Sequence, residues 1–144
     1  MTALADRALS INPNYARGWY VSGQIRRWAG DLDTAIAHFE ASLRLSPFGR
    51  VGPAREYIGA ALFLSGRFEE ALPKLLQAET GRTVPYRYLT ACYAHLGRLD
   101  EARATLARLR ALTPKVMPSV AHWRNAEHRE LFLSGMRLAM GEEA

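Results

Sequence analysis

The sequence predicts an all-α fold, a right-handed solenoid of antiparallel helix hairpins, about three in number, with a C-terminal capping helix. Glycine-centred turns recur at Gly30, Gly66 and Gly97. Each glycine is followed five residues later by an alanine, namely Ala35, Ala71 or Ala102. Apolar residues with helical spacing flank every turn. The repeating unit is therefore helix, tight turn, helix, and such units bury their apolar faces by stacking on one another.

Each turn carries residues that suit a helix hairpin. Glycine adopts the left-handed conformation that ends the first helix, where a β-carbon would clash. An acidic residue follows shortly after each glycine, at Asp33, Glu69 or Asp100. In the first turn of the next helix its charge favours the positive end of the helix dipole. The alanine is small because the two helices cross closely there, so we expect short antiparallel hairpins.

The composition fits one folded domain rather than a nucleic-acid reader. The chain has 144 residues, of which 49% are hydrophobic, so it can bury an ordered core. Its net charge is +5, but acidic residues are interspersed with the basic ones, as on an ordinary solvated surface. The nearest approach to a basic, aromatic cluster is Arg26, Arg27 and Trp28. We therefore expect no nucleic-acid binding.

Cysteine content and hydropathy predict a cytoplasmic protein. The single cysteine, Cys92, cannot form an internal disulfide, which fits a reducing compartment. No charged-then-apolar leader opens the sequence, and no apolar stretch approaches the ~20 residues that cross a bilayer. We expect no membrane contact by this chain.

The first hairpin carries a known repeat pattern. Trp19, Gly23, Ala35, Phe39 and Pro47 stand at the spacing of the tetratricopeptide repeat, and Pro13 precedes Pro47 by the 34-residue family period. The second and third hairpins match at most of their apolar positions. The sequence thus resembles this family over about residues 1–114. It departs at Ser22, where the family has Leu, and at Arg26, where it has Tyr.

The resemblance implies a division into repeats within a single domain. Residues 1–13 correspond to the second helix of a truncated repeat, so we expect the chain to be a fragment of a longer protein. The repeats themselves are expected at residues 14–47, 48–82 and 83–114. Unequal spacing of the turn glycines implies an extended loop over residues 47–53 and a shortened one near Gly81.

After Pro114 the repeat pattern fades. Residues 115–144 are expected to form a short helix over 117–123 and a last helix over 126–139, with Asn125 as its N-cap. Apolar residues fall on one face of the last helix, which suits a helix that covers the open end of a stack.

The C-terminal sequence has a second, looser resemblance. The segments at 97–103 and 126–137 are similar to the C-terminal region of bacterial signalling proteins in which such repeats follow a class III adenylate or guanylate cyclase domain or a winged-helix regulator domain. That resemblance implies a signalling role and a catalytic or regulatory domain outside this chain. No cyclase residue can be carried over, because that domain is not present here.

A search for catalytic chemistry finds no site. The sequence has no phosphate-binding loop and no Cys-x-x-Cys, and His122 and His128 would not share one helix face. We expect Cys92 to be a buried thiol, although His95, one turn away, leaves a nucleophile as an alternative. We therefore predict no catalytic residue, no metal and no cofactor.

A binding surface is the remaining prediction. The first helices of stacked hairpins line a concave groove, whose outward side chains are natural partner contacts. The predicted groove residues are Arg17, Tyr20, Gln24, Arg27, Trp28, Glu56, Tyr57, Phe63, Arg87, Tyr88 and His95. Aromatic residues and arginine are favoured at binding hot spots. Alternatively, Tyr57 and Tyr88 pack between hairpins and Arg17 pairs with an acidic neighbour.

The predicted function is that of a non-catalytic protein–protein interaction module that takes a peptide, helix or partner domain. The alternative is a structural or dimerisation spacer, a homodimer without a peptide ligand. Some family members grip a peptide carboxylate with Lys, Arg and Asn side chains. The corresponding Asn positions are Gln24, Ala60 and Ala91 here, so such a clamp is not expected.

Overall fold

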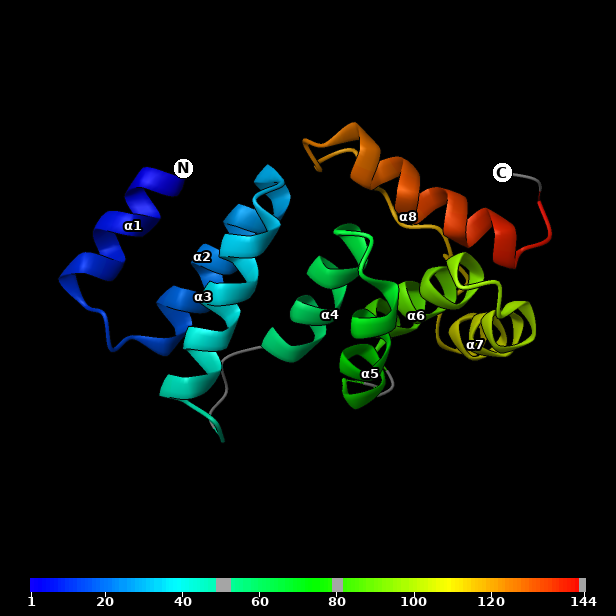
Figure 1. Ribbon diagram of the computed structural model, residues 1–144, viewed down its shortest axis with the longest axis horizontal. Helices are drawn as coiled ribbons and strands as arrows, with labels where there is room; N and C mark the ends of the chain where they lie inside the picture. Colours follow the sequence, from blue (N-terminus) through cyan, green and yellow to red (C-terminus); the bar gives the residue numbers. More distant parts are fainter. Residues whose placement is uncertain (49–52, 79–81, 143–144) are drawn as a thin grey trace.

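The computed structural model describes residues 1–48, 53–78 and 82–142. Over these ranges the chain forms eight α-helices and no strand (Figure 1). The helices are α1 (Thr2–Ile11), α2 (Ala16–Ala29), α3 (Leu32–Leu45), α4 (Ala54–Leu64), α5 (Phe68–Gln77), α6 (Thr83–His95), α7 (Leu99–Leu112) and α8 (Ala126–Ala139).

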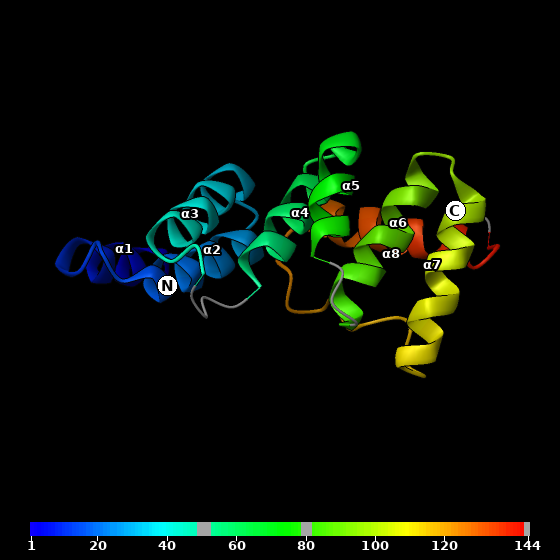
Figure 2. The same ribbon diagram turned by 90° about the horizontal axis from the view of Figure 1, so that it is seen from below.

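Three antiparallel hairpins, α2–α3, α4–α5 and α6–α7, stack in sequence order. The second helix of each hairpin contacts the first helix of the next, α3 against α4 and α5 against α6. Helix α1 lies against α2 at one end of the stack (Figure 2). The predicted all-α solenoid of helix hairpins is confirmed.

The turns have the predicted geometry. Gly30, Gly66 and Gly97 have φ angles of 89°, 75° and 75°, in the left-handed region. The alanines that follow them are fully buried. An acidic residue occupies the first turn of α3, α5 and α7, as expected.

The two helices of a hairpin approach closely, which explains why glycine occupies the motif position. A Cβ on Gly23 would stand 2.7 Å from the ring of Phe39, and one on Gly59 would stand 2.8 Å from the Leu75 side chain. Phe39 and Leu75 are fully buried and fill the centre of their hairpins. In each of these hairpins one large side chain packs on one glycine, and both pairs belong to the single core that runs through the stack.

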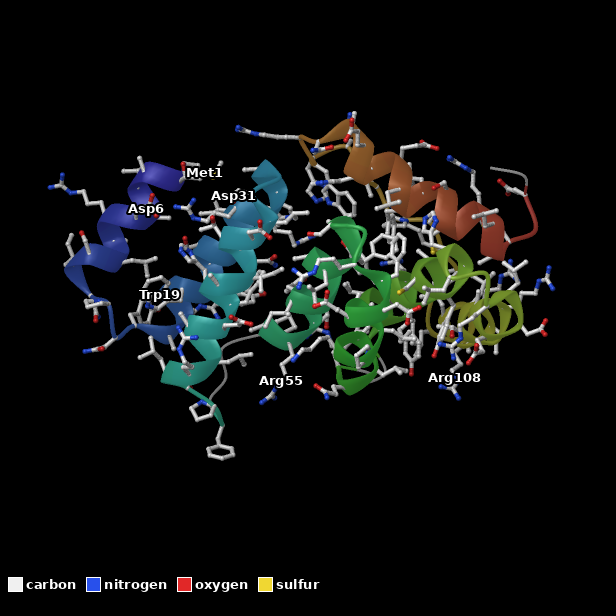
Figure 3. The ribbon with its side chains drawn as sticks, in the orientation of Figure 1. Met1, Asp6, Trp19, Asp31, Arg55 and Arg108 are labelled. Carbon is white, nitrogen blue, oxygen red and sulfur yellow. The ribbon has the colours of Figure 1, made fainter. Side chains whose placement is uncertain are left out.

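Arg26, a departure from the family pattern, has an observable role. Its guanidinium lies 2.5 Å from Asp6 of α1 and 3.1 Å from Asp31 in the turn before α3. Figure 3 shows these two aspartates near α2. The arginine therefore ties α1 to the first hairpin. The family has a tyrosine at this position, and the arginine supplies an ion-pair bridge in its place.

The predicted short helix over residues 117–123 is wrong. Residues 113–125, here called the strap, form turns and bends instead of a helix. Pro114 and Pro118 lack the backbone N–H that a helix needs, and they disfavour helical geometry in the residue before them. Several strap carbonyl groups accept hydrogen bonds from arginine side chains, which replace helical partners.

The last helix has the predicted bounds but a different place. Helix α8 spans Ala126–Ala139, and the Asn125 side chain accepts a hydrogen bond of 3.1 Å from the backbone N–H of His128, as a predicted N-cap should. We expected α8 at the open end of the stack. It lies instead across α6, with much smaller contacts to α7 and α4 (Figure 1).

The two loops whose lengths the sequence suggested fall largely outside the described residues. Residues 49–52 belong to the expected extended loop over 47–53, and Gly81 belongs to the expected shortened one. The repeat boundaries placed within these loops remain predictions.

Candidate functional site

The surface formed by the first helices α2, α4 and α6 is here called the inner face. The strap and α8 cover much of it, from α6 to the end of α2. The strap and α8 together are here called the cover. The predicted groove residues are therefore of three kinds: those buried under the cover, those that bind it and those still open to solvent.

Arg27 lies at the centre of the inner face. It is only 7% exposed, and its guanidinium carbon stands 4.8 Å from the ring centroid of Tyr57. Nη1 donates to the Tyr88 hydroxyl at 3.2 Å, and Nε donates to Gln24 Oε1 at 3.0 Å. Burial raises the pKa of Tyr88 to about 12, so this hydroxyl stays protonated at neutral pH. The arrangement holds one cation between aromatic rings.

Phe63 and Tyr88 are covered, which corrects the expectation that they face a partner. Phe63 is fully buried, with the Phe132 ring of α8 at a centroid distance of 6.3 Å. The ring of Tyr88 lies 5.0 Å from Phe132 and 6.4 Å from Trp123 of the strap. The cover thus uses the aromatic surface that the sequence assigns to a ligand.

Arg87 and His95 bind the cover directly. Arg87 donates from Nε to the Val116 carbonyl at 3.0 Å and from Nη2 to the Lys115 carbonyl at 2.7 Å. His95 Nε2 lies 2.7 Å from the Leu131 carbonyl, which can only accept, so this nitrogen carries the proton. Both residues recognise backbone oxygens, as peptide-binding side chains do.

Glu56 is the most deeply buried charged residue of the predicted set. It is 2% exposed, and its Oε2 lies 3.5 Å from Arg82 Nε. Oε1 has no hydrogen-bond partner among the described residues. Burial raises the pKa of this carboxyl to about 6. Glu56 therefore cannot contact a partner from the surface, contrary to the expectation.

The remaining predicted residues are accessible. Arg17 is exposed, Tyr20 and Gln24 are half-buried, and Trp28 is 39% exposed. Tyr57 is half-buried, with its ring stacked on Phe39 at 6.0 Å. These side chains come from α2 and α4, on the part of the inner face beyond the strap.

Two cavities flank the strap. The inner cleft, of about 200 Å³, lies between Arg27, Tyr57 and Arg87 on one side and strap residues Pro118 to Trp123 on the other. The N-terminal cleft, of about 440 Å³, lies between Met1, Ile25 and the strap. Both are lined by Trp28 and His122, whose rings meet edge to face at 5.9 Å and form the wall between them.

In the part of the chain that the structure describes, the surroundings of the cysteine do not favour catalysis. Cys92 is fully buried, its Sγ donates to the Phe68 carbonyl at 3.4 Å, and burial raises its pKa to about 12. A thiol in this state is a poor nucleophile, and His95, the base considered for it, is hydrogen-bonded to the Leu131 carbonyl. Over the described residues, no three His, Cys, Asp or Glu side chains gather as a metal site.

No helix in the described part of the chain is both long enough and apolar enough to traverse a bilayer.

Sequence reasoning missed the contribution of the strap to the site. Pro118, His122 and Trp123 line the inner cleft, although they lie outside the helices. The available signal was a tryptophan in a proline-containing segment without helical periodicity. Such a segment has to find its apolar contacts elsewhere on the protein.

Helix hairpins that stack in sequence order define a helical-repeat protein. Two family models described as tetratricopeptide repeat match residues 2–50 and 62–124, together most of the chain. The chain belongs to the tetratricopeptide-repeat family. It is an interaction module, and no enzyme family is indicated.

Solved structures of other proteins share this fold. YrrB, described as a TPR protein with an unusual peptide-binding site, superposes with a TM-score of 0.63 at 23% identity, over 97% of this chain and 75% of YrrB. MamA gives a TM-score of 0.70 at 18% identity, covering 97% and 85% of the two chains. The MamA RS-1 ArsTM double mutant gives 0.68 at 19%, covering 97% and 84%. No curated protein sequence matches the chain.

Proposed function

We propose that this module binds a segment of a partner protein at the open part of the inner face. The observation that carries the proposal is the platform of Arg27 on Tyr57, which borders the inner cleft beside the half-exposed Trp28. Arginine and large aromatic residues dominate binding energy at protein interfaces because they bury much area and keep polar groups available. The partner segment lies along α2 and α4 and reaches the inner cleft past Trp28.

The ligand is a peptide or a helix rather than a small molecule. The inner cleft opens beside the strap, and the accessible side chains continue from it along α2 to Arg17. An elongated surface of this kind fits an elongated ligand. The peptide-binding description of YrrB, a protein of the same fold, also supports this class of ligand.

The wider context is also part of the proposal. The similarity of segments 97–103 and 126–137 to repeats that follow cyclase or winged-helix domains supports a role in a bacterial signalling protein. The single reduced cysteine supports a cytoplasmic location. In this role the module couples a signalling domain to its partner.

A capture experiment with matched variants tests the binding site. The wild-type chain, an Arg17→Ala/Trp28→Ala variant and an Arg44→Ala/Leu45→Ala control are each immobilised and exposed to a lysate of the source cells. Arg44 and Leu45 are exposed on α3, away from the inner face. We expect proteins that bind wild type and control but not the first variant. Equal capture by all three chains would contradict the proposed site.

A second candidate, self-association, has one specific observation in its favour. Leu4 and Ile11 of α1 are 73% and 76% exposed, and a cavity of about 350 Å³ runs between α1 and α2. Exposed apolar surface of this kind marks interaction sites. Sedimentation of wild type and a Leu4→Glu/Ile11→Glu variant tests it. A dimer in wild type that the variant loses would support the spacer role, and a monomer at high concentration would remove it.

A further inference from the structure

Helix α8 is placed unlike the other helices of the chain. Each first helix in the stack packs on the second helix of its own hairpin and then on that of the preceding hairpin, as α4 does on α5 and α3 and α6 on α7 and α5. Helix α8 follows α7 but packs mainly on α6, across the inner face (Figure 1). It therefore does not extend the solenoid as a further repeat would. It occupies the position of a bound helix.

The strap holds this helix through contacts typical of peptide recognition. Arg87 donates to two consecutive backbone carbonyls, those of Lys115 and Val116. The backbone N–H of Arg124 donates to the Trp28 carbonyl at 3.3 Å. The inner cleft remains open between the strap and the floor of the inner face. These polar contacts do not depend on the identity of the strap side chains, so another peptide backbone can replace them.

The deep anchors of α8 lie on one face of the helix. Phe132 and Met136 are fully buried, and Phe132 meets the rings of Phe63 and Tyr88. Gly135 lies between them, and a Cβ there would stand 2.8 Å from the Ala91 Cβ and 2.9 Å from the His95 ring. An aromatic residue, a glycine three positions later and then a methionine form a compact anchor that fits the inner face.

The closest helix crossings of the first two hairpins do not involve α8, although all hairpins share one core with it. Phe39 and Leu75 pack against the glycines of their own hairpins. If α8 left the inner face, these close contacts would not be broken, but Phe63 and Tyr88 would lose the cover of Phe132. Exposed aromatic surface is unfavourable. Opening is therefore favoured only when another apolar helix takes the vacated place.

We infer that the strap and α8 act as an internal ligand of the inner face, which a partner helix of the same chemistry displaces. That helix is amphipathic, with a tryptophan before its N-terminus and the spacing aromatic, two residues, glycine, methionine on its apolar face. The inference rests on the proposed function, since it names the partner class for the same inner face. It adds that the chain regulates its own access to that partner.

The test uses the full chain and a synthetic, fluorescently labelled peptide of residues 113–142 as the probe. Gly135→Leu drives a side chain into Ala91 and His95 and so weakens the internal ligand. Glu127→Leu places the same side chain at an exposed position of α8 and serves as the control. We expect Gly135→Leu to bind the probe on the order of 10-fold more tightly than wild type and control, because more of its inner face is free. A Phe132→Ala peptide should bind none of the three.

Hydrogen exchange of the wild-type chain is the second measurement. It tests the inference even if the Gly135→Leu variant does not fold. Amides of α8 should exchange through local opening while those of α4 and α6 stay protected. The inference is overturned if a folded Gly135→Leu variant binds the probe no better than wild type. It is equally overturned if α8 exchanges only on global unfolding. Partner capture that depends on Trp28 and Arg17 would then still support the proposed function, so the two failures are distinguishable.

Discussion

The Arg27 guanidinium donates a hydrogen bond of 3.2 Å to the Tyr88 hydroxyl and so joins α2 of the first hairpin directly to α6 of the third. This hydrogen bond does not involve the second hairpin. It forms because the first helices of the three hairpins all lie along the inner face. Both residues are buried. A buried donor left without its acceptor would be costly.

Tyr88→Phe should destabilise the protein through this contact alone. The ring keeps its packing on Phe132, but Arg27 Nη1 loses its acceptor, and we expect a loss of about 1–2 kcal/mol in the free energy of unfolding. Urea unfolding followed by circular dichroism measures it. Tyr15→Phe, at an exposed position, is the control and should change nothing. Equal stability of Tyr88→Phe and wild type would show that the hydrogen bond contributes little.

Glu56→Gln should stabilise the protein in a pH-dependent way. Burial raises the pKa of Glu56 from 4.5 to about 6, so the folded state holds the proton more tightly than the unfolded state. Wild-type stability therefore falls as the pH rises through this interval, and the penalty is complete above it. The neutral glutamine avoids the penalty.

We expect Glu56→Gln to gain about 1 kcal/mol over wild type near pH 7.5 and nothing near pH 4, because only the ionised carboxylate is penalised. Thermal unfolding at the two pH values measures the difference. Glu40→Gln, on the exposed side of α3, should show no such pH dependence. An identical gain at both pH values would mean that the ionisation of Glu56 is not its cause.

Cys92 should be inert toward thiol reagents in the folded protein. Its thiol is fully buried and its pKa is raised to about 12, so almost no thiolate forms at neutral pH. A disulfide-exchange reagent should label the chain completely in denaturant and hardly at all without it. A Cys92→Ser variant should bind the partner as the wild-type chain does. Fast labelling of the native protein would revive the alternative of a reactive cysteine.

The hairpins could be predicted from the sequence because their determinants are local. Gly30 ends one helix and Ala35 permits the crossing with the next, and both features recur along the chain. Asn125 likewise marks the start of α8, and its side chain does cap that helix. Signals of this kind act over a few residues, so one sequence is enough to read them.

The site was less predictable, because it depends on where two amphipathic elements meet. The apolar face of α8 shows that the helix must be covered, but it does not distinguish the end of the stack from the inner face. That choice depends on the fit of Gly135 against Ala91 and of Phe132 against Phe63. The buried state of Glu56 follows from the same packing. Neither the placement of α8 nor the burial of Glu56 has a sequence pattern of its own.

Arg26→Gln should loosen α1 specifically. Arg26 joins Asp6 of α1 to Asp31 of the first turn, and its side chain is 14% exposed, so the pairs are partly shielded from solvent. We expect faster hydrogen exchange in α1, with a loss of about 1 kcal/mol or less in global stability, because the hairpin cores do not involve these charges. Added salt should weaken wild-type protection of α1 and leave the variant unchanged, since screening acts only where the ion pairs exist. Arg67→Gln, which breaks an ion pair with Glu70 of α5, is the matched control and should leave α1 as protected as in wild type. If α1 in the Arg26→Gln variant exchanges as slowly as in wild type, apolar contacts between α1 and α2 hold the helix and the ion pairs do not.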